Sequence, residues 1–169
     1  FYGRQMTKEL SSRGDENEGA KIFAYQVKEP ERYGVIDFDN DGKPLSIEEK
    51  PSSPKTNWAV IGLYYYDSQV VDIAKSLTPS GRGELEITDI NQAYLNEGKL
   101  KVHKLGRGFA WLDTGTHESL LEASQFIATL EARQGLKISS PEEIAWHLGY
   151  IDDEDLARLA AEYSNSQYG

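Results

Sequence analysis

Asp113 is the residue whose type and surroundings best suit metal chemistry. It stands in the segment Trp111-Leu-Asp-Thr-Gly-Thr116, between a predicted short strand and a predicted helix. Magnesium ions take one or two protein carboxylates and complete their octahedron with waters and substrate phosphates. An aspartate at the start of a helix can instead cap that helix. Asp113 is therefore a candidate magnesium ligand, and helix capping is the alternative.

A second candidate site lies at the end of a predicted strand, where the sequence reads Glu48-Glu49-Lys50-Pro51. Successive side chains of a strand point to opposite faces, so Glu48 and Glu49 point away from each other. A carboxylate that shares a face with Lys50 can bind a polyol and its phosphate together. A solvated strand end is the alternative, because charged residues are mostly exposed.

Two glycine-containing segments are weaker candidates. Gly34 begins a predicted strand, where a missing side chain permits close approach of a ligand but also suits a turn. Gly81-Arg-Gly83 runs into a predicted helix, and the first N–H groups of a helix can hold an anion. The acidic residues that follow, Glu84 and Glu86, are expected to repel phosphate, which argues against an anion site there.

Other kinds of site are excluded or lack support. The chain has no cysteine, which rules out disulfides, thiolate metal sites and cysteine nucleophiles. Its histidines, His103, His117 and His147, have no spacing typical of a zinc site or a catalytic triad. No Walker-type loop or Gly-x-Ser-x-Gly motif occurs. The three tyrosines at 64–66 alternate between faces, so some can pack in the core while others line a sugar pocket.

Strands come first among the elements that must position these residues. Alternating β-forming residues predict strands over 21–27, 33–38, 45–50 and 100–105. The nearly continuous apolar run over 58–66 is typical of a central strand. Asp39-Asn-Asp-Gly42 supplies turn chemistry and predicts a hairpin between the second and third strands.

Helices dominate the later part of the chain. Apolar residues at helical spacing predict helices over 68–77, 87–95, 116–135, 140–149 and 152–161, with Thr116 as a cap and a capping box at Ser140-Pro-Glu-Glu143. A further short helix is a candidate over 4–11, followed by a polar loop. This order of elements favours an α/β or α+β fold whose sheet begins partway through, because a first βαβ unit is missing.

Length and composition limit the class of protein. The chain has 169 residues, about the size of one domain. Its 38% hydrophobic and 11% aromatic content excludes global disorder. The net charge of −10 argues against binding of polymeric nucleic acid, although it permits a local basic pocket for a phosphorylated small molecule. The sequence has no apolar run long enough to predict a membrane span, and it begins with Phe1 and carries no signal-peptide pattern.

Motifs in fixed order connect these separate observations. They are Glu29-Pro-Glu-Arg-Tyr-Gly-Val, Ser46-Ile-Glu-Glu-Lys-Pro, Val60-Ile-Gly-Leu-Tyr-Tyr-Tyr-Asp, Arg82-Gly-Glu-Leu-Glu-Ile-Thr-Asp and Trp111-Leu-Asp-Thr-Gly-Thr. Arg133-Gln-Gly-Leu-Lys and Pro141-Glu-Glu-Ile-Ala follow near the end. Together they closely resemble the glucose-1-phosphate thymidylyltransferase family over nearly the whole chain.

The resemblance implies both a fold and a reaction. The implied fold is a Rossmann-like nucleotidyltransferase with a glycosyltransferase-A-like mixed sheet, of which this chain is the C-terminal part. Residues 1–116 would hold the sugar-phosphate and metal portion, and residues 117–169 a helical segment for oligomer or regulatory contacts. The implied reaction forms dTDP-glucose and pyrophosphate from dTTP and glucose 1-phosphate, for dTDP-rhamnose synthesis. Without the upstream nucleotide-binding half, the isolated chain is expected to be inactive and to self-associate.

The resemblance also implies roles for individual residues. Glu49 would accept sugar hydroxyls and Lys50 would pair with the sugar phosphate. Asp113 would be the second carboxylate on Mg²⁺, and Asp113 and Lys50 would form the catalytic pair. The full set expected to contact glucose 1-phosphate is Gly34, Glu49, Lys50, Val60, Thr88 and Trp111.

A second nucleotide site and an oligomer are implied as well. Residues matching a regulatory nucleotide site of the family are Tyr2, Gly3, Glu143 and Ile144, while His147 stands where an arginine is common. The family implies a homotetramer, small-molecule substrates, no membrane partner and a cytoplasmic location. Two alternatives stay open: a relative that uses another sugar or nucleotide, and a non-catalytic binding or assembly module.

Overall fold

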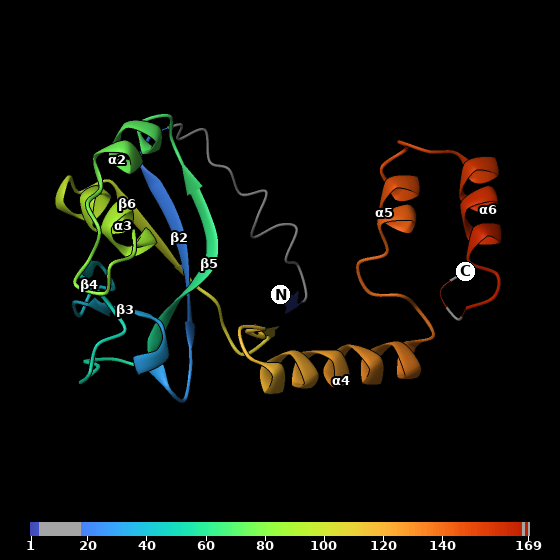
Figure 1. Cartoon of the computed structure of the whole chain (residues 1–169), viewed down its shortest axis with the longest axis horizontal. Helices are drawn as coiled ribbons and strands as arrows, with labels where there is room; N and C mark the ends of the chain where they lie inside the picture. Colours follow the sequence, from blue (N-terminus) through green and yellow to red (C-terminus); the bar gives the residue numbers. More distant parts are fainter. Residues whose placement is uncertain (4–17, 167, 169) are drawn as a thin grey trace. The chain divides into compact units, whose positions relative to one another are not determined.

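The computed structural model describes residues 1–3, 18–166 and 168. The candidate helix over 4–11 lies outside the described residues. The chain forms two compact units, Phe1–Trp111 and Leu112–Gly169 (Figure 1), each of which is described by itself below.

The first unit is built on a five-stranded mixed sheet. Its strands are β2 (Ala20–Gln26), β3 (Gly34–Phe38), β4 (Pro44–Glu49), β5 (Trp58–Tyr66) and β6 (Leu100–Lys104), in the order β4-β3-β5-β2-β6. The pair β2–β6 is parallel, and the other neighbouring pairs are antiparallel. All five predicted strands are confirmed to within about one residue at each end, and β5 is the central strand, as its apolar run predicts.

The predicted hairpin is formed by β3 and β4. Asp39 Oδ1 accepts hydrogen bonds from the backbone N–H groups of Asp41 and Lys43, at 3.0 and 2.8 Å. Gly42 has φ +83°, a left-handed conformation that glycine adopts without a side-chain clash. A short helix η1 (Pro30–Arg32) connects β2 to β3. The turn residues therefore fix the register that places Gly34 opposite Glu49.

One face of the sheet is covered by two helices. They are α2 (Val70–Ser76) and α3 (Ile87–Asn96), which lie on the same side of β2 and β5 (Figure 1). Ile90 and Tyr94 of α3 are buried against a sheet face that includes Ile22, Ile36 and Ile47. Burying this apolar face stabilises the unit and holds α3 in place over β4.

The opposite face has a smaller core. Phe23, Ile61 and Leu105 are buried there, and Trp111 packs against them. A second sheet of two short strands, β1 (Tyr2–Gly3) and β7 (Phe109–Ala110), also belongs to this unit. A Cβ on Gly3 would lie only 2.3 Å from Phe109 Cδ1, so the aromatic ring occupies the space of a side chain at Gly3.

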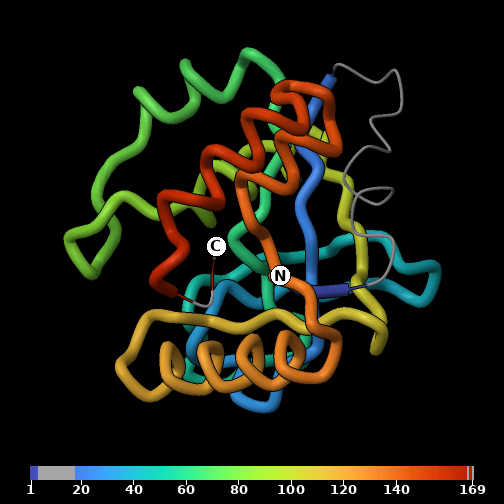
Figure 2. The backbone as a smooth tube through the Cα atoms, turned by 90° about the vertical axis from the view of Figure 1, so that its right-hand side faces the viewer, coloured from blue at the N-terminus to red at the C-terminus, as the bar shows by residue number. Residues whose placement is uncertain are grey.

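The second unit consists of helices. They are α4 (His117–Gln134), α5 (Pro141–His147) and α6 (Asp153–Glu162), with α5 and α6 side by side in Figures 1 and 2. These bounds confirm the predicted helices to within about two residues. Within the described residues, no helix is both long and apolar enough to cross a membrane.

Side-chain caps begin all three helices of the second unit. Thr116 accepts from the N–H of Ser119, whose hydroxyl accepts in turn from the Thr116 N–H. Ser140 accepts from the N–H of Glu143, which is the first of the two bonds of the predicted capping box. Asp152 caps α6 in the same way. These caps satisfy backbone donors that have no partner inside a helix.

Candidate functional site

Predicted substrate residues from four different elements converge in the first unit. A Cβ on Gly34 of β3 would lie 3.1 Å from Thr88 Oγ1 of α3 and 3.3 Å from Glu49 Oε2 of β4. It would lie 3.9 Å from Val60 Cβ of β5. Because Gly34 has no side chain, Thr88 Oγ1 and Glu49 Oε2 can lie beside its backbone in space that a Cβ would crowd. The structure thus brings together four of the six residues expected to contact the substrate.

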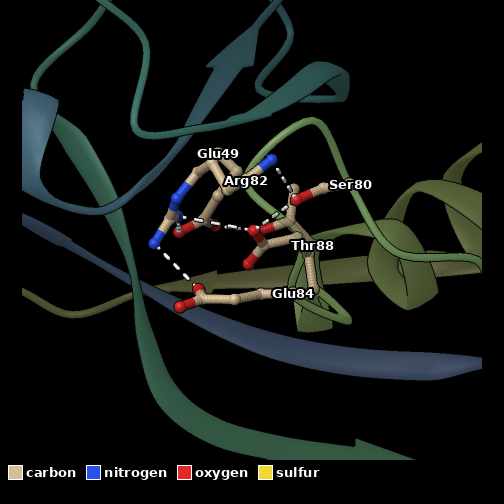
Figure 3. A network of polar contacts seen from close by, with 6 residues as sticks. Glu49, Ser80, Arg82, Glu84 and Thr88 are labelled. Atoms are coloured by element: carbon tan, nitrogen blue, oxygen red, sulfur yellow. Dashed lines mark hydrogen bonds and ion pairs between the residues drawn. The ribbon is translucent and has the colours of Figure 1, made fainter.

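Glu49 is held by a buried hydroxyl. Thr88 is 6% exposed, and its Oγ1 donates a hydrogen bond of 2.5 Å to Glu49 Oε2 (Figure 3). The Glu49 side chain keeps 22% exposure, so the carboxylate is anchored at one oxygen and still reachable from solvent. Glu48 is exposed on the other face of β4, as strand alternation predicts. Glu49 is therefore the member of the acidic pair that is fixed in direction.

Arg82 reaches the same carboxylate. Its Nη1 lies 3.7 Å from Glu49 Oε1, and the guanidinium also pairs with Glu84 at 2.9 Å and Glu86 at 3.4 Å (Figure 3). Glu84 and Glu86 both pair with Arg82, and with Glu49 they give the cluster more negative than positive charge, so the expectation that this segment disfavours phosphate stays a prediction. The sequence signal for this cluster is the spacing of arginine and glutamates at i, i+2 and i+4.

A tight turn presents Arg82. The hydroxyl of Ser80 accepts from the Arg82 N–H at 3.2 Å and donates to Glu86 at 3.0 Å. Gly83 has φ +79° and donates its N–H to the Ser80 carbonyl. The Arg82 side chain is 41% exposed, so water partly screens its pairs with the three carboxylates.

Lys50 has an unusual backbone. Its φ is +44°, in the left-handed region that residues other than glycine seldom adopt. The Lys50 N–H donates to the Tyr33 carbonyl at 3.0 Å, which ties this conformation to the residue before Gly34. Such backbone strain tends to cluster at functional sites. Lys50 is exposed, so it adds a cation directly after Glu49 in the chain.

Tyr64 lies close enough to Glu49 for the two to interact electrostatically. Burial and then the charge of Glu49 raise the pKa of Tyr64 above its usual 10.0. The phenol therefore stays protonated near neutral pH and keeps a proton that it can donate. Its ring stacks on Tyr66 with centroids 5.9 Å apart.

Trp111 contacts Tyr33, the residue directly before Gly34 of the candidate site. The two rings make an edge-on contact with centroids 4.9 Å apart, and Tyr25 contacts Trp111 at 6.4 Å. Tyr25 also donates its hydroxyl proton to the Phe109 carbonyl at 2.9 Å. Trp111 packs with the smaller core, whereas Val60 belongs to the core under α3.

Asp113 belongs to the second unit and is half-buried. Its carboxylate oxygens lie 3.4 and 3.5 Å from the position of a Cβ on Gly115, so the side chain turns back over the Asp-Thr-Gly backbone. The N-cap of α4 is Thr116, so the alternative in which Asp113 caps that helix is wrong. Among the described residues, no group of three or more histidine, cysteine or acidic side chains is arranged to hold a metal ion.

The residues predicted for regulation fall into two places. Tyr2 and Gly3 form strand β1, paired with β7 in the first unit. Glu143, Ile144 and His147 lie on α5 in the second unit, where His147 Nε2 is 3.6 Å from Glu143 Oε1 and Ile144 is 48% exposed. The structure therefore brings together the α5 residues of this set.

Comparison with known proteins decides the family. Residues 1–129 match the nucleotidyl transferase family. The chain belongs to this family. The matched region of this nucleotidyl transferase includes every residue predicted to contact the sugar phosphate or the metal.

Curated relatives give a finer comparison. The chain is 54% identical over 169 residues to a glucose-1-phosphate thymidylyltransferase from Neisseria meningitidis and 56% identical to one from Mycolicibacterium smegmatis. All of this chain is matched in both cases, but only 59% and 58% of the relatives' own lengths. The chain thus spans a little over half the length of these relatives.

A solved structure supports the fold. The chain resembles a crystal structure of a candidate glucose-1-phosphate thymidylyltransferase from Bacillus anthracis in complex with sucrose, with a TM-score of 0.60 and 46% identity. The match covers 73% of this chain and 48% of that chain. The predicted α/β nucleotidyltransferase fold, of which this chain is a portion, is therefore confirmed.

Proposed function

We propose that the full-length protein is a glucose-1-phosphate thymidylyltransferase that supplies dTDP-glucose for dTDP-rhamnose synthesis. The observation that carries the proposal is the convergence of Gly34, Glu49, Val60 and Thr88, with Lys50 and Arg82 as adjacent cations. Carboxylate and hydroxyl groups suit sugar hydroxyls, while ammonium and guanidinium groups suit phosphate. Family membership and the names of the relatives support the reaction class.

The reaction requires little covalent chemistry from the protein. A phosphate oxygen of glucose 1-phosphate attacks the α-phosphorus of dTTP, and the bond to pyrophosphate breaks. Positioning and charge neutralisation are the main catalytic devices for such transfers. In this chain Glu49 accepts the sugar hydroxyls and Lys50 holds the sugar phosphate. Gly34, whose missing side chain leaves room for Glu49 and Thr88, contributes a backbone contact. Arg82 pairs with Glu49 and helps to orient that carboxylate.

Asp113 is suited to supply one carboxylate ligand to a magnesium ion. Its carboxylate is half-buried, and the N-cap of α4 is Thr116 and not Asp113. Magnesium accepts as few as one or two carboxylates when substrate phosphates complete its coordination shell. The bound ion would neutralise phosphate charge at the reacting centre. Asp113 would hold it together with ligands from the substrates and from the remainder of the full-length protein.

The second unit is proposed to serve assembly and regulation, with a homotetramer as the assembled form. The exposed apolar side chains of α5, including Ile144, suit a contact with another protein surface. Within this unit, regulatory nucleotide binding would use Glu143, Ile144 and His147. Residues 1–116 and 117–169 remain the predicted division between catalysis and assembly, and a cytoplasmic location belongs to the same proposal.

A pyrophosphate-release assay tests the reaction. The full-length protein is incubated with dTTP, glucose 1-phosphate and Mg²⁺, and parallel reactions replace the sugar phosphate or the nucleotide. We expect release that requires all three components. Release with another sugar phosphate or nucleotide, but not with this pair, would overturn the assigned substrates. No release with any pair would favour a binding or assembly module.

Variants connect the activity to the site. We expect Lys50→Met to raise the KM for glucose 1-phosphate about tenfold or more, because a charge-assisted bond contributes about 1.5–3 kcal/mol. Lys43→Met, an exposed lysine in the β3–β4 turn, is the matched control and should leave KM unchanged. Equal effects of the two substitutions would overturn the role of Lys50.

A further inference from the structure

The inner side of α3 carries a ladder of polar contacts that packing alone does not require. Thr88, Asn91 and Tyr94 are spaced three residues apart, which places them on one face of the helix. All three are buried, and Asn91 and Tyr94 have no exposed surface. The first rung is the Thr88–Glu49 bond of the candidate site. The next two rungs are more remote from that site along the helix.

The second rung joins α3 to the central strand. Tyr66 of β5 donates its hydroxyl proton to Asn91 Oδ1 at 2.6 Å. In the described part of the structure, Asn91 Nδ2 is buried without a hydrogen-bond partner. An unsatisfied buried polar group is costly, so an apolar residue would be expected at this position if it served packing alone. The amide of Asn91 therefore calls for a role beyond filling the core.

The third rung fixes the end of the same helix. Tyr94 donates its hydroxyl proton to Asp67 Oδ1 at 2.6 Å, and Asp67 follows β5 directly. The Tyr66 and Tyr94 rings are stacked, with centroids 5.6 Å apart. The second and third rungs thus tie α3 to β5 and the residue after it, while Thr88 at the first rung contacts β4. A displacement of α3 along β5 would move the Thr88 hydroxyl away from Glu49.

We propose that the Tyr66–Asn91 hydrogen bond is a positioning pair for the sugar-phosphate site: it sets the register of α3 on β5 and thereby holds Thr88 against Glu49. This inference rests on the proposed function for its substrate. Directional bonds suit this role, because apolar contacts between a helix and a sheet tolerate sliding that a hydrogen bond does not. Tyr66 and Asn91 touch neither sugar nor phosphate in this proposal.

The experiment separates positioning from stability. In the full-length protein, Tyr66→Phe, Asn91→Leu and the double variant are compared with the wild type. Each single variant leaves one buried polar group without its partner and should lower the melting temperature, whereas the double variant replaces both partners by apolar groups and should recover most of it. Gln92→Ala is the matched control, because its side chain bonds to Asn96 at 2.8 Å on the outer side of α3.

Two readouts decide the proposal. We expect the double variant to keep a KM for glucose 1-phosphate raised about tenfold, with the KM for dTTP unchanged, although its stability is restored. We also expect its crystal structure to show the Thr88–Glu49 bond lengthened or lost. Gln92→Ala should change neither readout.

The contradicting outcomes are distinct from failure of the proposed function. A double variant with wild-type KM and an intact Thr88–Glu49 bond would show that the pair is merely structural. If the wild-type protein does not use glucose 1-phosphate at all, the proposed function fails, and the crystal structure of the double variant still decides whether Tyr66 and Asn91 position Thr88. An intact Thr88–Glu49 bond would then overturn the inference.

Discussion

The two units of the chain use their apolar side chains in opposite ways. Every apolar residue that is buried in the described structure belongs to Phe1–Trp111. In Leu112–Gly169, the described part has no buried residue in any of its three helices, and Ser140 is its buried position. Large apolar side chains such as Leu121, Leu148 and Tyr150 are 58%, 59% and 78% exposed there.

This contrast shows that residues that favour a helix locally do not by themselves provide a hydrophobic core. The helices of the second unit are well capped, yet helices of this length are marginal in water without an apolar face to bury. The first unit buries both faces of its sheet and so carries its own stability. We therefore expect the second unit to be stabilised by surfaces of the assembled protein.

The largest difference in stability between the two units is expected when one isoleucine in each is replaced by alanine. Ile36 in β3 is fully buried, and Ile144 in α5 is 48% exposed. We expect Ile36→Ala to lower the free energy of unfolding by about 2–5 kcal/mol through lost transfer energy and the cavity left behind. Ile144→Ala in the dissociated protein should cost less than about 0.5 kcal/mol. Denaturant unfolding of both variants, below and above the concentration at which the protein associates, measures the difference.

The concentration dependence makes this test informative. An Ile144→Ala cost that appears only in the associated protein would identify α5 as part of an interface and sharpen the contrast. Equal losses of unfolding free energy for the two substitutions in the dissociated protein would contradict the contrast between the units, because Ile144 would then be covered within one chain.

Close packing in the first unit predicts a second effect. A methyl group on Gly3 would overlap the Phe109 ring at 2.3 Å, whereas one on Gly62 of β5 would meet nothing within 4 Å. We expect Gly3→Ala to destabilise the protein by about 1–3 kcal/mol, because overpacking forces neighbouring groups to move. Gly62→Ala is the control and should be neutral or slightly stabilising. Melting curves that rank the two variants the other way would contradict the packing described for β1 and β7.

The same contrast explains which parts of the fold follow from sequence. Strands β2 to β6 are predicted because their alternating or continuous apolar residues reflect the core that they bury. Strands β1 and β7 are missed, since two residues such as Tyr2 and Gly3 carry no periodicity. The parallel pairing of β2 with β6 is not predicted either, because it joins two strands far apart in sequence and no local residue pattern specifies that partner.

The candidate site is predictable only in part. Gly34, Glu49 and Thr88 are each ambiguous by themselves, because their separation in sequence hides their convergence in space. The family resemblance identifies them as a group, and the geometry agrees with that grouping. The role of Arg82 is missed, because the sequence alone does not show that Glu84 and Glu86 pair with it. The positions of Asn91 and Tyr66 depend on side-chain direction, which no spacing rule supplies.

Polar contacts of the first unit are expected to contribute less to stability than its apolar core, and their contribution depends on pH. Asp67 accepts hydrogen bonds from Tyr94 and from the backbone N–H of Gly19, and these bonds hold the pKa of Asp67 below its usual 3.8. A lowered carboxyl pKa contributes stability above the unfolded-state pKa, and this contribution is lost as pH falls through the folded-state pKa. We expect Asp67→Asn to melt at a lower temperature than the wild type at pH 6, with the difference shrinking as the pH falls below 4. A difference that does not change with pH would contradict this account.

The smallest effect is expected for the corresponding polar contact of the second unit. Tyr168 donates its hydroxyl proton to Glu142 Oε2 at the start of α5, and this bond is the main reason why the pKa of Glu142 lies below its usual 4.5. Because Glu142 is only half-buried, water partly screens its interaction and its contribution to stability is small. Tyr168→Phe should therefore raise the pKa of Glu142, measured by NMR titration, while the melting temperature near neutral pH falls less than in Asp67→Asn. As for Asp67, a lowered pKa adds stability only while the carboxyl is ionised. The difference in melting temperature between Tyr168→Phe and the wild type should therefore vanish when Glu142 is protonated. A larger loss for Tyr168→Phe than for Asp67→Asn would mean that polar contacts, rather than an outside surface, hold the second unit together.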